Sequence, residues 1–188
     1  KKGTIVGKGV VNNKVSNHMF KMLEKEGIKT HYVSADVDNA TMEVLKATPF
    51  GKGLEVICRL RATGSFIRRY GAYIEDGTVF ENGYVETTLK DDEKGDPLIT
   101  SEGLEVLGIM SQEMFNQMKE QTLKITRIVA DDLASMGLEL WDIKFEFGYN
   151  NDEVILIDEI ASGNMRVYKD GKIVDPVDLT DIILSHTK

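Results

Sequence analysis

The chain is organised around residues 140–148, which read Leu-Trp-Asp-Ile-Lys-Phe-Glu-Phe-Gly, and around a second run at 154–160, Val-Ile-Leu-Ile-Asp-Glu-Ile. Apolar and charged residues alternate in the first run, which predicts a strand with Asp142, Lys144 and Glu146 on one face. The second run is also strand-like, and the Gly, Asn and Asp residues between the two runs are typical of a turn. The two runs therefore predict an antiparallel hairpin.

Two acidic residues interrupt the second run. Asp158 and Glu159 directly follow an unbroken apolar stretch and precede Ile160, so the pattern predicts that both are buried. Burying a carboxylate is unfavourable unless it is paired with a cation or bound to a metal. The position of Asp158 and Glu159 therefore indicates a functional site.

The hairpin register decides which residues face these carboxylates. If Gly148 pairs with Val154, Lys144 lies opposite Asp158 and Glu146 lies diagonal to it on the same face. Diagonal neighbours are roughly 7–8 Å apart at the backbone, so the two carboxylates would reach a single hard cation. A slip of one residue would turn Asp158 to the other face. An ordinary ion pair on a solvated sheet face is the alternative that the pattern leaves open.

The composition is typical of a globular protein. The 188 residues are 41% hydrophobic and 29% charged, enough for one domain or two small lobes. The net charge of -8 argues against nucleic acid as the main partner. We expect no membrane span and no signal peptide, because no apolar run approaches the roughly 20 residues that a span needs. The single cysteine, Cys58, predicts a buried thiol in a reducing cytoplasm and no disulfide framework.

A local reversal of charge follows the predicted strand at 54–62. Arginines on one face of this strand lead into Thr63-Gly64-Ser65, where glycine lets backbone amides approach a ligand and serine adds a hydroxyl donor. This combination predicts an anion-binding cradle, with a solvated strand end as the alternative. The arginines of the segment are Arg59, Arg61, Arg68 and Arg69.

The remaining pattern mixes helices and short strands, which favours the α+β class. Asn12-Asn13 is predicted to cap a helix that ends at Gly27, and Ser111 to open the longest helix, which ends at Gly137. The glycine-rich segment at 3–9 is either a plain turn or a phosphate-holding loop. Further predicted elements are strands at 28–34, 40–47 and 79–88, a polar loop at 90–97 and a closing helix from about 178.

The order and spacing of these motifs resemble the SAICAR synthetase family of purine biosynthesis. The most specific part is the strand 142–148 followed by Asp158-Glu159-Ile160, and the resemblance extends over nearly the whole chain. The other matching segments are 7–13, 27–31, 55–59 with Gly64-Ser65, Lys90-Asp91-Asp92, Asp96-Pro97 and Arg166. The resemblance implies an ATP-grasp-like α+β fold of antiparallel sheets with flanking helices. Its two lobes would be residues 1–48 and 49–188, with nucleotide bound between them.

The activity that the resemblance implies is that of an ATP-dependent ligase using Mg²⁺. Such an enzyme joins carboxyaminoimidazole ribonucleotide to L-aspartate through an acyl phosphate, giving SAICAR, ADP and phosphate. Its partners would be these small molecules and ATP, with no role for nucleic acid or membrane. A homo-oligomer is a possible assembly that the resemblance leaves open.

The resemblance also implies residue roles by position. Glu146 and Asp158 would bind magnesium and the nucleotide, and Lys144 would complete the catalytic group near the transferring phosphate. Lys90 and Lys46 would contact the nucleotide, Lys46 from the hinge between the lobes. The substrate-binding positions would be Arg59, Ser65, Asp96 and Arg166.

The chain departs from the family pattern in several places. Ala161-Ser162-Gly163 replaces the usual Ser-Pro-Asp, which removes a carboxylate near the substrate, and Leu60 and Thr63 replace the usual Asn and Ala. The family's N-terminal Gly-Lys-Ala-Lys segment is not in the sequence, so we expect it upstream of Lys1. Two alternatives follow from these differences. One is a divergent ligase that uses another acid or amine, and the other is a nucleotide-binding module without catalysis.

Overall fold

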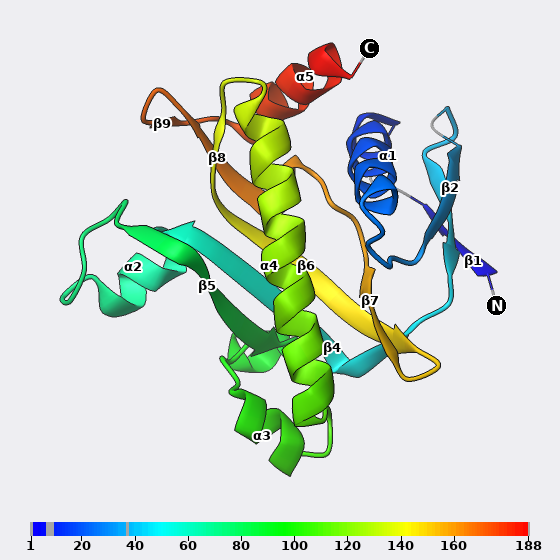
Figure 1. Ribbon diagram of the computed structural model, residues 1–188, viewed down its shortest axis with the longest axis vertical. Coiled ribbons are helices and arrows are strands. Elements are labelled where there is room, and N and C mark those ends of the chain that lie inside the picture. The colour runs from blue at the N-terminus through cyan, green and yellow to red at the C-terminus, as the bar shows by residue number, and fades with distance from the viewer. Residues whose placement is uncertain (1, 7–9, 37, 188) are drawn as a thin grey trace.

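The computed structural model describes residues 2–6, 10–36 and 38–187, in two antiparallel sheets with helices packed against them (Figure 1). The smaller sheet has the strand order β1-β3-β2 and lies beside helix α1. Its strands and this helix are β1 (Lys2–Val6), α1 (Val10–Lys25), β2 (Tyr32–Asp36) and β3 (Thr41–Leu45). The predicted α+β class with antiparallel sheets is confirmed.

The larger sheet has the predicted hairpin at its centre. Its strand order is β5-β4-β6-β8-β9, and β7 also pairs with β6. The strands are β4 (Thr48–Arg61), β5 (Val79–Leu89), β6 (Glu139–Asn150), β7 (Glu153–Ile157), β8 (Met165–Lys169) and β9 (Lys172–Ile173). All these pairings are antiparallel, and successive residues of each strand point to opposite faces.

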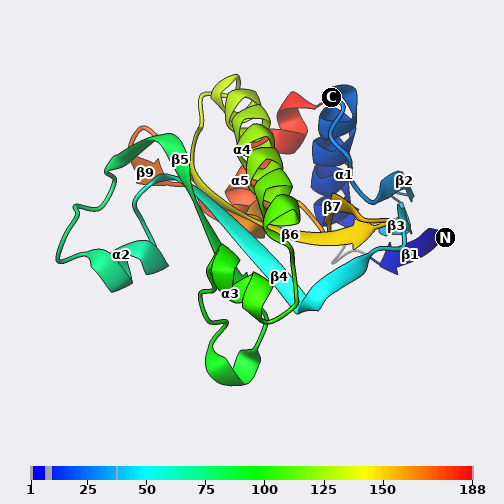
Figure 2. The ribbon, with the colours of Figure 1, turned by 60° about the horizontal axis from the view of Figure 1, so that its bottom comes forward.

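One face of the larger sheet forms the core with helix α4 (Gln112–Ala134). Val56, Cys58 and Phe145 of the sheet are buried with Ile125 of the helix, so the prediction that Cys58 is a buried thiol is confirmed. Figure 2 shows α1, α4 and α5 on the same side of the sheet. The opposite face of the sheet is therefore left to polar side chains.

The ends of α4 follow from local chemistry. Ser111 caps the helix, because its hydroxyl accepts a hydrogen bond from the backbone N–H of Met114 at 3.2 Å. Gly137 has φ of 77°, which suits the chain reversal after the helix. Both predicted ends are confirmed within two or three residues.

The shorter helical segments occupy the connections between strands. They are α2 (Ser65–Tyr70), the 3-10 turn η1 (Asp92–Lys94), α3 (Ser101–Val106), the 3-10 turn η2 (Ser162–Asn164) and α5 (Pro176–His186). The closing helix was predicted from the sequence, whereas α2 and α3 were not. Within the described part of the chain, no helix is long and apolar enough to cross a bilayer.

The hairpin register differs by one residue from the prediction. Gly148 pairs with Ile155 and not with Val154, and β6 continues to Asn150. The loop shrinks to Asn151 and Asp152, whose φ values of 51° and 63° are those of a two-residue type I′ turn. The predicted pairing of Lys144 with Asp158 is therefore wrong.

The carboxylates after β7 are also less buried than predicted. The strand ends at Ile157, and Asp158 adopts a positive φ of 67°, so the alternation of the strand no longer directs its side chain. Asp158 is exposed and Glu159 is half-buried. Lys144 lies opposite Ile57 of β4 instead.

The first helix begins earlier than predicted. Asn12 and Asn13 lie inside α1 and do not cap it, because the helix already starts at Val10. The Asn13 side chain instead donates to the carbonyl of Thr41 at 3.2 Å and connects α1 to the smaller sheet. The glycine-rich segment predicted as a turn or phosphate loop includes residues 7–9, which lie outside the described residues.

Candidate active site

The polar face of the larger sheet gathers most of the predicted site residues. Glu55 and Arg59 of β4 lie on this face, and their cross-strand neighbours on β6 are Glu146 and Asp142. Two glutamates directly opposite each other repel, so this end of the face requires cations. The arginine and the aspartate attract each other at the other end.

Two lysines neutralise the glutamates. The Lys144 ammonium lies 2.9 Å from a Glu55 oxygen, and the Lys90 ammonium donates to Glu146 at 2.8 Å. Glycine at position 53 makes room for the second pair, because a Cβ there would lie 2.6 Å from the Lys90 side chain. The hydrogen bond to Glu146 raises the pKa of Lys90. Desolvation opposes this rise, and the charges of the surrounding carboxylates add to it.

Asp158 adds a further carboxylate to this end of the face. Burial raises the pKa of the Glu146 carboxyl, Lys90 opposes the rise, and the adjacent Asp158 contributes to it. Two adjacent carboxylates repel each other when both are ionised, and a bound cation would relieve this repulsion. The Glu146–Asp158 pair is therefore suited to a cation.

His31 holds the backbone at Asp158, a role that the sequence did not predict. Its ring Nε2 lies 3.1 Å from the Asp158 carbonyl oxygen, and its backbone N–H donates to Leu156 at 3.0 Å. Burial lowers the pKa of His31 to about 4, so the ring is neutral at pH 7. The sequence pattern did not predict this contact, which joins the segment before β2 to the segment after β7.

The donor set fits magnesium bound together with a nucleotide. Mg²⁺ prefers oxygen ligands and is usually held by one or two carboxylates plus substrate phosphates. Glu146 and Asp158 supply such a pair. Among residues 2–6, 10–36 and 38–187, no group of three or more His, Cys, Asp or Glu side chains is arranged to hold a metal. The two carboxylates would therefore share the ion with phosphate oxygens.

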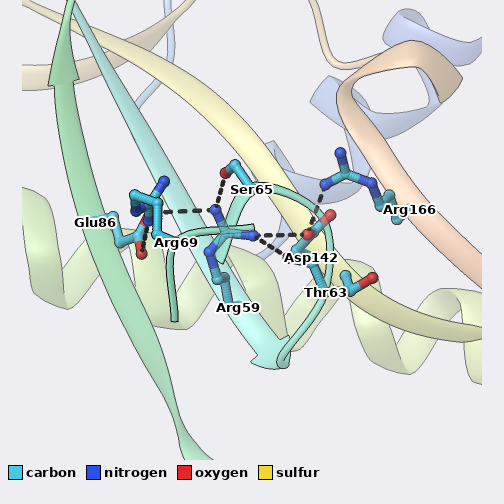
Figure 3. Close-up of polar contacts among 7 residues, drawn as sticks. All are labelled: Arg59, Thr63, Ser65, Arg69, Glu86, Asp142 and Arg166. Atoms are coloured by element: carbon cyan, nitrogen blue, oxygen red, sulfur yellow. Dashed lines mark hydrogen bonds and ion pairs between the residues drawn. The ribbon is translucent and has the colours of Figure 1, made fainter. Parts of the chain in front are cut away.

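The other end of the face is built on Arg59 (Figure 3). Its side chain is 1% exposed, and one terminal nitrogen donates to the Thr63 carbonyl at 3.0 Å and to Asp142 at 3.1 Å. The other terminal nitrogen donates to the Ser65 hydroxyl at 2.8 Å and to Glu86 at 3.2 Å. Protein groups thus hold Arg59 on both sides, and it forms the wall of the site.

Asp142 connects this wall to Arg166. One Asp142 oxygen accepts from Arg59 and also from Arg166, at 2.9 Å. Burial raises the pKa of Asp142, whereas Arg166 and Arg59 oppose the rise. Glycine is required at position 64, with φ of 59°, because a Cβ there would lie 2.6 Å from the Arg166 guanidinium. Arg166 stays 41% exposed and remains available to a ligand.

A cavity of about 440 Å³ opens at this end, within the size range of small-molecule sites. The predicted residues that line it are Arg59, Ser65, Lys144 and Arg166. Arg68 and Gly163 line it as well. A larger cavity of about 660 Å³, between Lys29 and Gln121, contains none of the predicted site residues.

Five predicted site residues do not line this cavity. Lys90, Glu146 and Asp158 lie at the carboxylate end of the face, and Lys46 and Asp96 make other contacts. Lys46 is exposed after β3, and its carbonyl oxygen accepts from the Asn150 side chain at 3.1 Å. Asp96 accepts from the backbone N–H of Asp91 at 2.8 Å and so braces the loop after Lys90. The structure shows these local contacts, and the predicted ligand contacts of Lys46 and Asp96 stay predictions.

The architecture described above matches that of solved SAICAR synthetases. A structural-genomics SAICAR synthetase superposes with a TM-score of 0.86 at 35% identity, covering 96% of this chain and 88% of that one. A SAICAR synthetase in complex with ADP gives a TM-score of 0.84 at 31% identity, over 100% of this chain and 82% of that one. The fold is therefore of the SAICAR synthetase type.

Sequence comparison leads to the same family. The model of the SAICAR synthetase family matches residues 1–178. The phosphoribosylaminoimidazole-succinocarboxamide synthase of Clostridium tetani is 48% identical over 183 residues, which cover 96% of this chain and 80% of that protein. The chain belongs to the SAICAR synthetase family, and the resemblance stated from the motifs is confirmed.

Proposed function

We propose that this chain catalyses the phosphoribosylaminoimidazole-succinocarboxamide synthase reaction, an ATP-dependent ligation in de novo purine biosynthesis. The observation that carries the proposal is the polar sheet face. It has a cation-seeking carboxylate pair, Glu146 and Asp158, at one end and an arginine-lined cavity at the other. Lys144 lies between them. A ligase that activates a carboxylate with ATP requires a site for the metal-bound nucleotide next to a site for the anionic substrate.

The reaction has two bond-forming steps. In the first step, a carboxylate oxygen of carboxyaminoimidazole ribonucleotide attacks the γ-phosphorus of ATP. ADP leaves, and the product is an acyl phosphate. The amine of L-aspartate then attacks the acyl carbon, displaces phosphate and loses a proton, giving SAICAR. Bound Mg²⁺ supplies charge neutralisation of the phosphates.

The chain's own residues divide this task. Glu146 and Asp158 would hold the ion, with Lys90 balancing their charge and, together with Lys46, contacting the nucleotide. Lys144 lines the cavity, with its ammonium 2.9 Å from Glu55, and would neutralise the transferring phosphoryl group. Ser65 and Arg166 would hold the ribonucleotide, with Arg59 as the wall behind Ser65 and Asp96 beside the same cleft.

The arrangement of the two sheets supports a division into lobes. We place the boundary between residues 1–48, around the smaller sheet, and 49–188, around the larger one, with nucleotide bound where they meet. The reaction is proposed to take place in the cytoplasm, where a free thiol such as Cys58 stays reduced.

A coupled assay of ADP release by the full-length protein tests this function. We expect ADP release with Mg²⁺, ATP, the ribonucleotide and L-aspartate. We expect none when either the ribonucleotide or L-aspartate is left out. Turnover only with another amine would replace the proposal by a divergent ligase. That alternative is motivated by Gly163, which lines the cavity where the family usually has a carboxylate. Magnesium-dependent nucleotide binding without turnover under any of these conditions would contradict an enzymatic role.

A further inference from the structure

Helix α2 carries two of the groups that line the cavity, and its apolar contacts with the sheet come from Phe66, whose ring packs against Phe80 and Tyr84 of β5. It spans only Ser65–Tyr70, and Phe66 is its buried residue. Helices this short are marginal without tertiary contacts. Ser65 at its start and Arg68 near its end both line the cavity. Their position therefore depends on what fixes α2 to the sheet.

Glu86 of β5 makes the polar part of that connection (Figure 3). Its side chain is 3% exposed, and each carboxylate oxygen accepts from a different arginine. One accepts from Arg69 of α2 at 2.7 Å, and the other from Arg59 of β4 at 3.2 Å. The same Arg59 nitrogen donates to the Ser65 hydroxyl at 2.8 Å. Glu86 thus fixes one end of α2 directly through Arg69 and the other through Arg59.

The hydrogen-bond directions favour a ligand on the cavity side. Because the Ser65 oxygen accepts from Arg59, its own O–H is free to donate to another acceptor. Arg68 is exposed and lines the same cavity. One hydroxyl donor and one guanidinium on a fixed helix suit a phosphate oxygen.

We propose that Glu86 is a positioning residue for the anionic substrate. It holds α2 so that Ser65 and Arg68 meet the phosphate of the ribonucleotide, and it does not itself touch the reacting atoms. This inference rests on the proposed function, since it takes the arginine-lined cavity as the ribonucleotide site.

The test is Glu86→Gln, which keeps the size of the side chain and removes its charge. We expect the KM for the ribonucleotide to rise about tenfold, the scale of one charge-assisted hydrogen bond. The KM for ATP and kcat should stay within about twofold, because the residues proposed to bind the nucleotide lie outside α2. The matched control is Glu139→Gln, which breaks an exposed pair with Arg61 at 3.1 Å and should change none of these values.

A second variant, Arg69→Gln, breaks the direct contact between α2 and Glu86 and the contact of Arg69 with Tyr70, but leaves the Glu86–Arg59 pair in place. The Arg69 side chain is partly exposed, so the fold tolerates this change more easily. The variant should raise the same KM in the same direction. An unchanged ribonucleotide KM in active Arg69→Gln protein would overturn the proposal, as would equal rises for all substrates in Glu86→Gln. Absence of ADP release by the unmodified protein would instead contradict the proposed function.

Discussion

The carboxylate of Asp158 is placed by its backbone and by His31. A non-glycine residue with φ of 67° is unusual, and it persists where surrounding contacts hold it. His31 supplies such a contact on the carbonyl of Asp158. Because that carbonyl is an acceptor, we infer that Nε2 carries the proton of the neutral ring. The carboxylate can then point toward Glu146 although the strand alternation does not direct it there.

The buried histidine makes stability sensitive to acid. The pKa of His31 is lowered to about 4 in the folded chain, against 6.5 when unfolded, so the unfolded state takes up the proton first as pH falls. The stabilisation from a neutral His31 is complete above pH 6.5 and is lost between pH 6.5 and about 4. The full difference corresponds to about 3 kcal/mol. Urea unfolding across this pH range should show a flatter dependence for His31→Gln than for the unmodified chain.

The control for this prediction is His186→Gln, on the exposed last turn of α5. It should keep the pH dependence of the unmodified chain. If His31→Gln loses as much stability as the unmodified chain between pH 6.5 and about 4, groups other than His31 cause the acid sensitivity.

At the scale of elements, the β6–β7 hairpin shows what local sequence can and cannot specify. Its existence follows from two apolar runs and a polar turn. Its register does not, because Val154, Ile155 and Leu156 are all buried and burial gives no preference between neighbouring registers. The turn decides instead, since Asn151 and Asp152 both tolerate the positive φ of a type I′ turn.

Substitutions at Asp152 test this turn. Asp152→Gly should raise the free energy of unfolding by about 0.5–1 kcal/mol, because glycine adopts φ of 63° without strain. Asp152→Val should lower it by about 1–2 kcal/mol, because a β-branched residue is strained in this region. Thermal or urea unfolding of the pair measures the difference. Equal stabilities would mean that the turn does not set the register.

At the scale of the whole molecule, the sequence predicted the residue types of the site better than their arrangement. Alternation in β4 and β6 placed Arg59 and Glu146 on polar faces, and the structure brings these faces together. The supporting contacts of Glu86 and His31 were not predictable, because they join segments far apart in the chain without any local pattern. Alternation also failed to predict that Arg59 is almost fully enclosed by protein groups.

The proposed function requires that the carboxylate pair and the arginine-lined cavity act together through a magnesium-bound nucleotide. A substitution at Asp158 tests that requirement most directly. Asp158→Asn removes one charge and keeps the side-chain size. Asp170→Asn is a matched control, since Asp170 is exposed and also has a positive φ, of 51°.

Calorimetric titration of ADP into the full-length protein, with and without Mg²⁺, is the decisive measurement, with ADP-release rates taken on the same samples. The unmodified protein and Asp170→Asn should bind ADP more tightly with Mg²⁺. Asp158→Asn should lose this dependence and fall in turnover by about 100-fold or more, the scale of removing one electrostatic group from an active site. Its unfolding temperature should stay close to that of the unmodified protein. Magnesium-dependent ADP binding and near-normal turnover in Asp158→Asn would contradict the account.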